Sequence, residues 1–190
     1  ILCRGISSIT SFDIEIFKQI GVVVKLLGKA SIVEENLIAS VEPVLIDKNS
    51  IFGTVKDAFN IVSITGNTVG QLLFYGQGAG KNPTANAVVS DILDIVTGAY
   101  ESDNFIQNGE ITSNKVEFSS GRYYIRTDIK EKEEISKTIG MLNQNCINFE
   151  ILNENRSLVL ITDHISNKSI QKITKELEAS FNNYFYARIA

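Results

Sequence analysis

The sequence has few of the residues from which specialised sites are built. Among its 190 residues are two cysteines, two prolines, one histidine and no tryptophan. Cys3 and Cys146 form neither a CxxC motif nor a zinc-ligand spacing, so we expect two reduced thiols and no metal site. His164 has no triad partner and no metal cluster around it in the sequence, which favours a surface-loop position.

The sequence also lacks a strong excess of charge and a long apolar run. It has 18 Lys and Arg against 22 Asp and Glu, a net charge of −4, with no basic block, so we expect no nucleic-acid partner. The apolar run from Ile20 to Leu27 is interrupted by Gly21 and Lys25, which excludes a membrane span there. Residues 1–5 do not resemble a signal peptide, and without an initiator methionine they begin as though cut from a longer chain. We expect a cytoplasmic protein with no membrane partner.

What remains is ordinary for a globular protein, with 44% hydrophobic and 21% charged residues. A polar stretch between Ser102 and Gly121 separates two regularly patterned segments. We therefore predict a first unit at residues 1–102, a linker at 103–121 and a second unit at 122–190.

The first unit has a mixed pattern of helices and strands. Thr10 and Ser11 can cap a helix that contains Asp13 and Glu15 in its first turn, and Gly21 suits the position just after its end. The elements that the later patterns predict are strands at 22–33 and 37–46, a helix at 53–61, and strands at 60–65 and 68–75.

The sequence pattern of the second unit predicts the element order βαββαβ. Its expected elements are a strand at 122–128, a helix at 131–143, strands at 147–151 and 157–162, a helix that Ser166 caps, and a strand at 184–189. This order is typical of a ferredoxin-like arrangement, in which two helices cover one face of a four-stranded antiparallel sheet. The fold class is therefore α+β, with a mixed-sheet unit followed by a ferredoxin-like unit.

A glycine-rich segment, GQGAGKNPT at 76–84, lies between a predicted strand and an apolar helix. Asn82 can cap that helix and Pro83 suits its first position. Glycines allow close backbone approach, and free N–H groups at a helix start attract a phosphate, carboxylate or amide. The spacing does not fit the P-loop, because Tyr75 and Asn82 stand where its first glycine and its Ser or Thr belong. It does not fit GxGxxG either, because Lys81 or Pro83 stands where the third glycine belongs. A ligand cradle and a tightly packed turn both remain open.

The wider pattern resembles the homoserine dehydrogenase family. The segments that carry the resemblance are GISSITSFDIEIFKQIG at 5–21, VKLLGKA at 24–30, VEPVLI at 41–46 and FYGQGAGKNPTANAVVSDILD at 74–94. The resemblance implies the end of a substrate and dimerisation domain from an enzyme that uses NADP or NAD to interconvert L-aspartate 4-semialdehyde and L-homoserine, in threonine and methionine biosynthesis. In the family this glycine loop reaches the cofactor, and its final glycine, here Gly80, is the contact carried over.

The second unit resembles an ACT domain, which implies a small effector such as threonine and a homodimer or higher oligomer. The family's Pro-Gly at the first strand–helix turn is replaced here by Glu133-Glu134, which puts effector binding at that turn in doubt.

The resemblance places the catalytic lysine and the nucleotide-binding domain upstream of Gly5, so we expect no catalytic residue in this chain and no dehydrogenase activity from it alone. We expect Asp13 and Lys18 on a solvated helix face and Glu42 in a structural position. The alternative function is a non-catalytic module for amino-acid sensing or oligomerisation. The failed P-loop spacing argues against a third reading, a free-standing nucleotide-binding protein.

Overall fold

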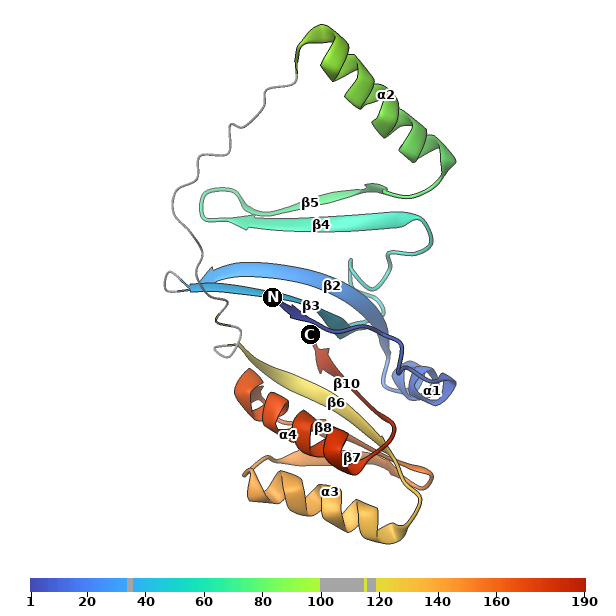
Figure 1. The fold of residues 1–190 in the computed structure, drawn as a ribbon, viewed down its shortest axis with the longest axis vertical. Helices are drawn as coiled ribbons and strands as arrows, with labels where there is room; N and C mark the ends of the chain where they lie inside the picture. The colour runs from blue at the N-terminus through green and yellow to red at the C-terminus, as the bar shows by residue number, and fades with distance from the viewer. Residues whose placement is uncertain (34–35, 100–114, 116–118) are drawn as a thin grey trace. The chain divides into compact units, whose positions relative to one another are not determined.

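A computed structural model describes residues 1–33, 36–99, 115 and 119–190. The chain separates into two compact units, one made of Ile1–Lys48 with Ile111–Ala190 and the other of Asn49–Glu110. Residues of both predicted sequence units thus share the first compact body (Figure 1). Most of the predicted linker, 103–121, lies outside the described residues, and the domain boundaries stay a prediction.

The C-terminal part of the first compact unit has the predicted order βαββαβ. Its main elements are β6 (Ser120–Asp128), α3 (Lys132–Gln144), β7 (Phe149–Glu154), β8 (Ser157–Thr162), α4 (Asn167–Ser180) and β10 (Tyr184–Ile189). The strands pair antiparallel in the order β10-β6-β8-β7. A two-residue strand, β9 (Ile165–Ser166), pairs with the start of β6 and leads into α4, which Ser166 caps as predicted.

The N-terminal strands extend this sheet. β2 (Val22–Val33) and β3 (Asn36–Asp47) form a long antiparallel pair. The other edge of β3 is shared: β1 (Leu2–Cys3) runs parallel to it at Ser40 and Val41, and β10 runs parallel to it at Val44 and Leu45. The result is a mixed sheet with both parallel and antiparallel pairs, as the sequence predicted for the first unit.

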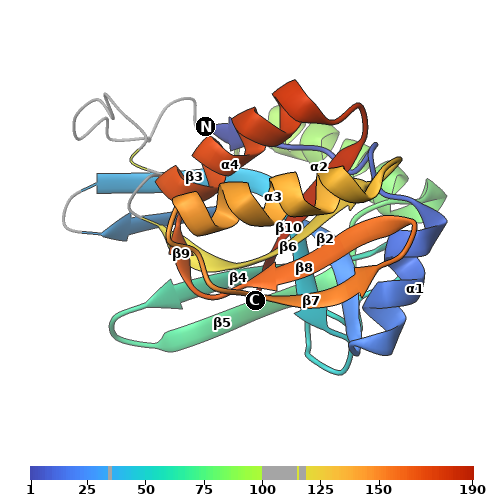
Figure 2. The same ribbon diagram turned by 90° about the horizontal axis from the view of Figure 1, so that it is seen from below.

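Both faces of the central strands are buried. On one face, which α3 and α4 cover (Figure 2), apolar side chains of β6 and β8 pack against these two helices. On the other face, Tyr124, Val159 and Phe185 pack with Ile16 and Phe17 of α1 (Ser11–Gln19). Because successive residues of a strand point to opposite faces, β6 contributes Tyr123 and Ile125 to the first core and Tyr124 to the second. α1 therefore covers a sheet face that α3 and α4 leave open.

The second compact unit consists of a hairpin and a helix. β4 (Phe59–Gly66) and β5 (Gly70–Gln77) pair antiparallel around the predicted turn, and α2 (Lys81–Thr97) follows. None of the residues of α2 is buried within the described part of the chain. No helix of the described residues is long and apolar enough to cross a membrane.

The predicted helix at 53–61 is wrong. Residues 51–54 form turns, and β4 begins at Phe59. The Ser50 hydroxyl accepts a hydrogen bond from the Gly53 N–H at 3.1 Å, and Asp57 has φ +54°, a left-handed conformation that a helix cannot contain. The apolar residues at helical spacing belong partly to a strand, whose backbone groups pair with β5 instead.

Candidate functional site

The glycine-rich segment forms the turn between β5 and α2. The Gly78 N–H donates to the Ala58 carbonyl at 3.1 Å, which anchors the turn to the start of the hairpin. Gly80 has φ +117° and ψ 164°, a combination that residues with a side chain rarely adopt. It serves as the N-cap of α2, and the first helical hydrogen bond runs from the Thr84 N–H to the Gly80 carbonyl at 3.1 Å.

The predicted start of this helix is wrong by two residues. Gly80, not Asn82, is the N-cap, and Pro83 occupies the third helical position instead of the first. The shift costs no hydrogen bond, because the N–H groups of the whole first turn lack partners within a helix. The backbone conformation of Gly80 decides that the helix begins after Gly80 and not after Asn82. The amino-acid composition of the segment does not reveal that conformation.

The turn is chemically suited to a polar or anionic group. No side chain of the described residues caps α2, and its first turn has no acidic residue, so the helix begins with free N–H groups at its positive end. A Cβ on Gly78 would come within 2.0 Å of the side-chain amide nitrogen of Asn60, so Gly78 packs closely against that exposed side chain. Both readings of the sequence are compatible with this geometry, and the role of Gly80 in cofactor binding stays a prediction.

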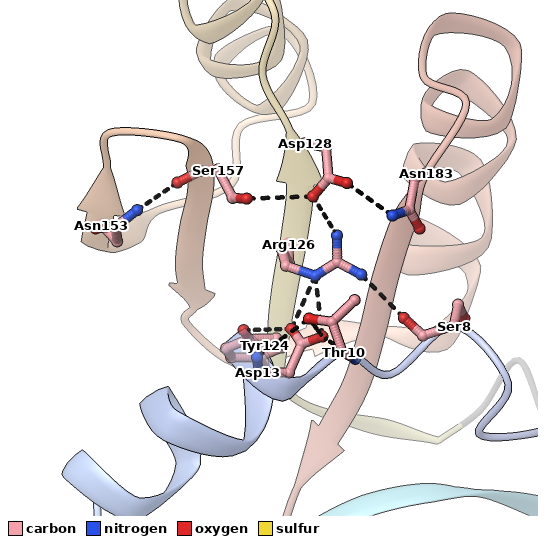
Figure 3. Close-up of polar contacts among 9 residues, drawn as sticks. All are labelled: Ser8, Thr10, Asp13, Tyr124, Arg126, Asp128, Asn153, Ser157 and Asn183. Atoms are coloured by element: carbon pink, nitrogen blue, oxygen red, sulfur yellow. Dashed lines mark hydrogen bonds and ion pairs between the residues drawn. The ribbon is translucent and has the colours of Figure 1, made fainter.

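A second polar arrangement lies inside the first compact unit and joins α1 to β6 (Figure 3). The Arg126 Nε donates to both carboxylate oxygens of Asp13 at 2.9 and 3.0 Å, and the Tyr124 hydroxyl donates to the same carboxylate at 2.8 Å. All three residues are fully buried. Asp13 also accepts from the Thr10 N–H and hydroxyl, which completes a capping box at the start of α1.

The expectation that Asp13 lies on a solvated face is therefore wrong, whereas Lys18 is exposed as expected. The helix register places Asp13 beside Ile16 and Phe17 on the buried side. A buried carboxylate requires a cation and hydrogen bonds, and Arg126 and Tyr124 supply them.

The far side of the Arg126 guanidinium connects to the surface. Its NH1 pairs with Asp128 at 2.5 Å, and its NH2 donates to the Ser8 carbonyl at 2.9 Å. Asp128 in turn accepts from the Ser157 hydroxyl at 3.1 Å and from the Asn183 side-chain amide at 2.7 Å. This polar network thus holds together the 5–10 segment, β6, β8 and the turn before β10 (Figure 3).

The network predicts a loss of stability at alkaline pH. Burial, and then the charge of Asp13 and its hydrogen bond, raise the pKa of Tyr124 far above its ordinary value, and burial also raises the pKa of Tyr123 despite Arg188. Because the folded-state pKa is raised, the stabilisation is complete below the unfolded pKa of about 10 and is lost as pH rises above it. We expect phenolate absorbance of the folded chain to lag behind that of the unfolded chain. Tyr124→Phe should reduce this lag, and an identical lag in that variant would contradict the assignment.

Glu42, predicted to be structural, is the centre of a third cluster. Its carboxylate lies between two arginines, forming ion pairs with Arg4 and with Arg188, the latter at 3.5 Å. The Ser40 hydroxyl donates to it at 3.2 Å. Arg188 also donates to the Tyr123 hydroxyl at 3.0 Å. Glu42 thus ties β3 to the segment after β1 and to β10, which is a structural role.

The remaining sequence candidates are unremarkable in structure. His164 is exposed in the short loop after β8, as predicted. Cys3 and Cys146 are both free and exposed. Within the described part of the chain, no group of three His, Cys, Asp or Glu side chains could hold a metal ion.

Sequence reasoning missed the three arginines. Arg126 follows Tyr123, Tyr124 and Ile125 in a predicted strand, and a charge in such a strand is a signal for a buried partner. Arg4 and Arg188 lie near opposite ends of the sequence and come together only in the folded sheet. Their spacing in the sequence therefore does not predict that both pair with Glu42.

Solved structures with the same fold provide the first comparison. A crystal structure of the homoserine dehydrogenase from Thiobacillus denitrificans matches with a TM-score of 0.73 at 24% identity, covering 98% of this chain and 47% of that one. One from S. aureus matches with a TM-score of 0.62 at 27% identity, covering 98% and 46%. The fold is therefore the mixed α/β fold with a mixed sheet that these dehydrogenases share.

Sequence comparison agrees. Residues 1–93 match the sequence model of the homoserine dehydrogenase family. The homoserine dehydrogenase of Helicobacter pylori is 34% identical over 191 residues, which cover 94% of this chain and 44% of that protein. That of Synechocystis sp. is 42% identical over 107 residues, which cover 54% of this chain and 25% of that protein. The chain belongs to the homoserine dehydrogenase family, and it spans less than half the length of these relatives.

Proposed function

We propose that this chain is the C-terminal part of a homoserine dehydrogenase, a cytoplasmic enzyme that interconverts L-aspartate 4-semialdehyde and L-homoserine in threonine and methionine biosynthesis. In the intact enzyme NADP or NAD supplies the hydride chemistry. The single observation that carries the proposal is the turn at 76–83, where Gly80, with a positive φ, begins a helix of 17 residues with uncapped N–H groups.

The residues of this chain bind and position the cofactor and substrate, and they do not take part in proton or hydride transfer. Gly78 and Gly80 shape a turn without projecting side chains, so its backbone N–H groups are open to a polar group of a cofactor. The mixed sheet of β1, β2 and β3 supplies the floor of a substrate domain. The general acid lysine and the main nucleotide-binding domain belong, by resemblance, to a segment before Gly5.

The exposed apolar surface of the second compact unit supports this assignment. A two-stranded hairpin is marginal by itself in water, and large apolar side chains of β4, β5 and α2 lie at least one-third exposed, including Val62, Phe74, Tyr75, Val89 and Leu93. Apolar patches of this kind mark surfaces that other parts of an assembly cover. We propose that the rest of the enzyme, as a homodimer or higher oligomer, covers them.

We further propose that residues 122–190 are an ACT-type regulatory domain. The order βαββαβ and the strand order β10-β6-β8-β7 support the ferredoxin-like arrangement of that domain. The start of α3 is occupied by the chain's own carboxylates: Glu131 caps it, and Glu134 accepts from the backbone N–H groups of Lys130 at 2.6 Å and of Glu131 at 3.3 Å. These bonds, chiefly that from Lys130, lower the pKa of Glu134. An amino-acid effector such as threonine is therefore not expected to bind at this turn through its carboxylate.

The proposal predicts that the 190-residue chain alone does not oxidise L-homoserine with NADP or NAD. The physical reason is that the proposed catalytic lysine and hydride-carrying domain are supplied by another segment. The measurement is the rate of reduced-cofactor absorbance at saturating substrate, compared with the product of the same reading frame extended upstream. Oxidation of L-homoserine by the 190-residue chain alone would overturn its assignment as an inactive part of a larger enzyme. An extended product that folds but is inactive would overturn the assignment as a homoserine dehydrogenase.

A further inference from the structure

We propose that a cavity between residues 4–8 and β10 is a binding site for a small organic carboxylate. This cavity has a volume of about 350 Å³ and lies within the first compact unit. Its polar lining comprises Arg4, Ser7, Ser8, Asn182 and Asn183, and Pro43 and Phe185 form an apolar part. The proposal goes beyond the proposed enzyme function, because it does not depend on the catalytic residues.

The charge of the lining selects an anion. Arg4 is the one charged residue among those that line the cavity in the described part of the chain. Its counter-charge is shared, because the carboxylate of Glu42 is paired with both Arg4 and Arg188. The outward bond of Arg4 is weak, since its NH1 reaches the Tyr186 carbonyl only at 3.4 Å. The cluster of Arg4, Arg188 and Glu42 therefore keeps one net positive charge, which a carboxylate in the cavity would neutralise.

The lining also offers hydrogen bonds of the right kind. Hydroxyl groups of Ser7 and Ser8 and the amide of Asn182 can donate to a carboxylate or to a neighbouring hydroxyl. β10 pairs with β3 only at Arg188 and Ile189 among the described residues. The Tyr186 carbonyl faces Arg4, and backbone groups two residues apart on a strand point to the same side, so Tyr184 directs its N–H and carbonyl to this edge as well.

The walls of the cavity are held in place by the buried network. The Ser8 carbonyl accepts from Arg126, and the Asn183 side chain donates to Asp128. Arg4 lies over the Tyr186 ring, with its guanidinium carbon 3.7 Å from the ring centre. A site whose side chains are fixed before binding loses less conformational entropy on binding. The same network holds Asp13 of α1.

The test is calorimetric titration of the 190-residue chain with L-lactate and with L-threonine. Both carry a carboxylate beside a hydrogen-bonding group, and lactamide is the neutral match of lactate. We expect lactate or threonine to bind and lactamide not to bind. Binding of lactate alone would identify a hydroxy acid, and binding of threonine an amino acid. No binding of either carboxylate at millimolar concentration would overturn the proposal.

Two variants assign any binding to this cavity. Asn182 is exposed and no described bond involves its side chain, so Asn182→Asp should fold and, by placing a like charge near the ligand, weaken binding about tenfold. Asn148→Asp makes the same change at an exposed position outside the cavity and should leave binding unchanged. Equal affinities of the two variants would overturn the site. Arg4→Gln should weaken binding by at least about tenfold.

Discussion

Replacing Arg126 with methionine is expected to lower the free energy of unfolding by about 3–5 kcal/mol, the usual effect of leaving a buried charge without its partner. Asp13 is fully buried and receives two hydrogen bonds from Arg126. Methionine would fill part of the volume of the arginine but would leave the carboxylate with only Tyr124 and the capping box. Chemical denaturation followed by circular dichroism measures the change.

The matched control is Arg156→Met, which removes an exposed arginine from the turn before β8 and should change the free energy of unfolding by less than about 0.5 kcal/mol. Asp13→Asn should be less harmful in the Arg126→Met background than in the native chain, because both variants remove the same ion pair. Strictly additive effects, or a loss below about 1 kcal/mol for Arg126→Met, would show that the pair does not couple α1 to β6.

Replacing Glu42 with glutamine is expected to lower the free energy of unfolding by about 3 kcal/mol. The change keeps the shape of the side chain but leaves Arg4 and Arg188 close together without the carboxylate that lies between them. Glu42 has only 5% of its surface exposed, so solvent cannot replace the lost charge. The same denaturation measurement applies.

The control here is Glu150→Gln on β7, where the side chain is exposed and the charge is screened by solvent. If the Glu42→Gln variant and the Glu150→Gln variant had the same free energy of unfolding, this cluster would not join β3 to β10. A loss confined to Glu42→Gln would confirm that the sheet depends on the charge between β3 and β10.

Much of the C-terminal half could be predicted from the sequence, because its strands and helices have clear periods. Residues 184–189 form the predicted strand, and Ser166 caps the predicted helix. The signals are local: alternation along a strand, an apolar stripe along a helix and a capping hydroxyl. The same signals located the pair β2 and β3 and the turn of the hairpin.

The errors arose where long-range contacts or a single backbone angle decide the structure. Residues 53–61 have helical spacing, but pairing of β4 with β5 and the positive φ of Asp57 favour turns and a strand. Asp13 satisfies the pattern of an exposed first-turn carboxylate, and only Arg126, distant in sequence, makes its burial favourable. The glycine turn could be located, but its ligand could not, because the geometry is compatible with both packing and binding.

The pairing of β10 with β3 has a consequence for the order in which this chain can fold. Val44 pairs with Arg188, so this edge of β3 is completed only when β10 has emerged from the ribosome. Contacts between such distant residues form slowly, since a long loop must close first. Until then the edge of β3 and the apolar side chains of α1 face solvent. We therefore expect the nascent segment of α1, β2 and β3 to depend on chaperones, whereas the residues from β6 onward can begin to associate locally.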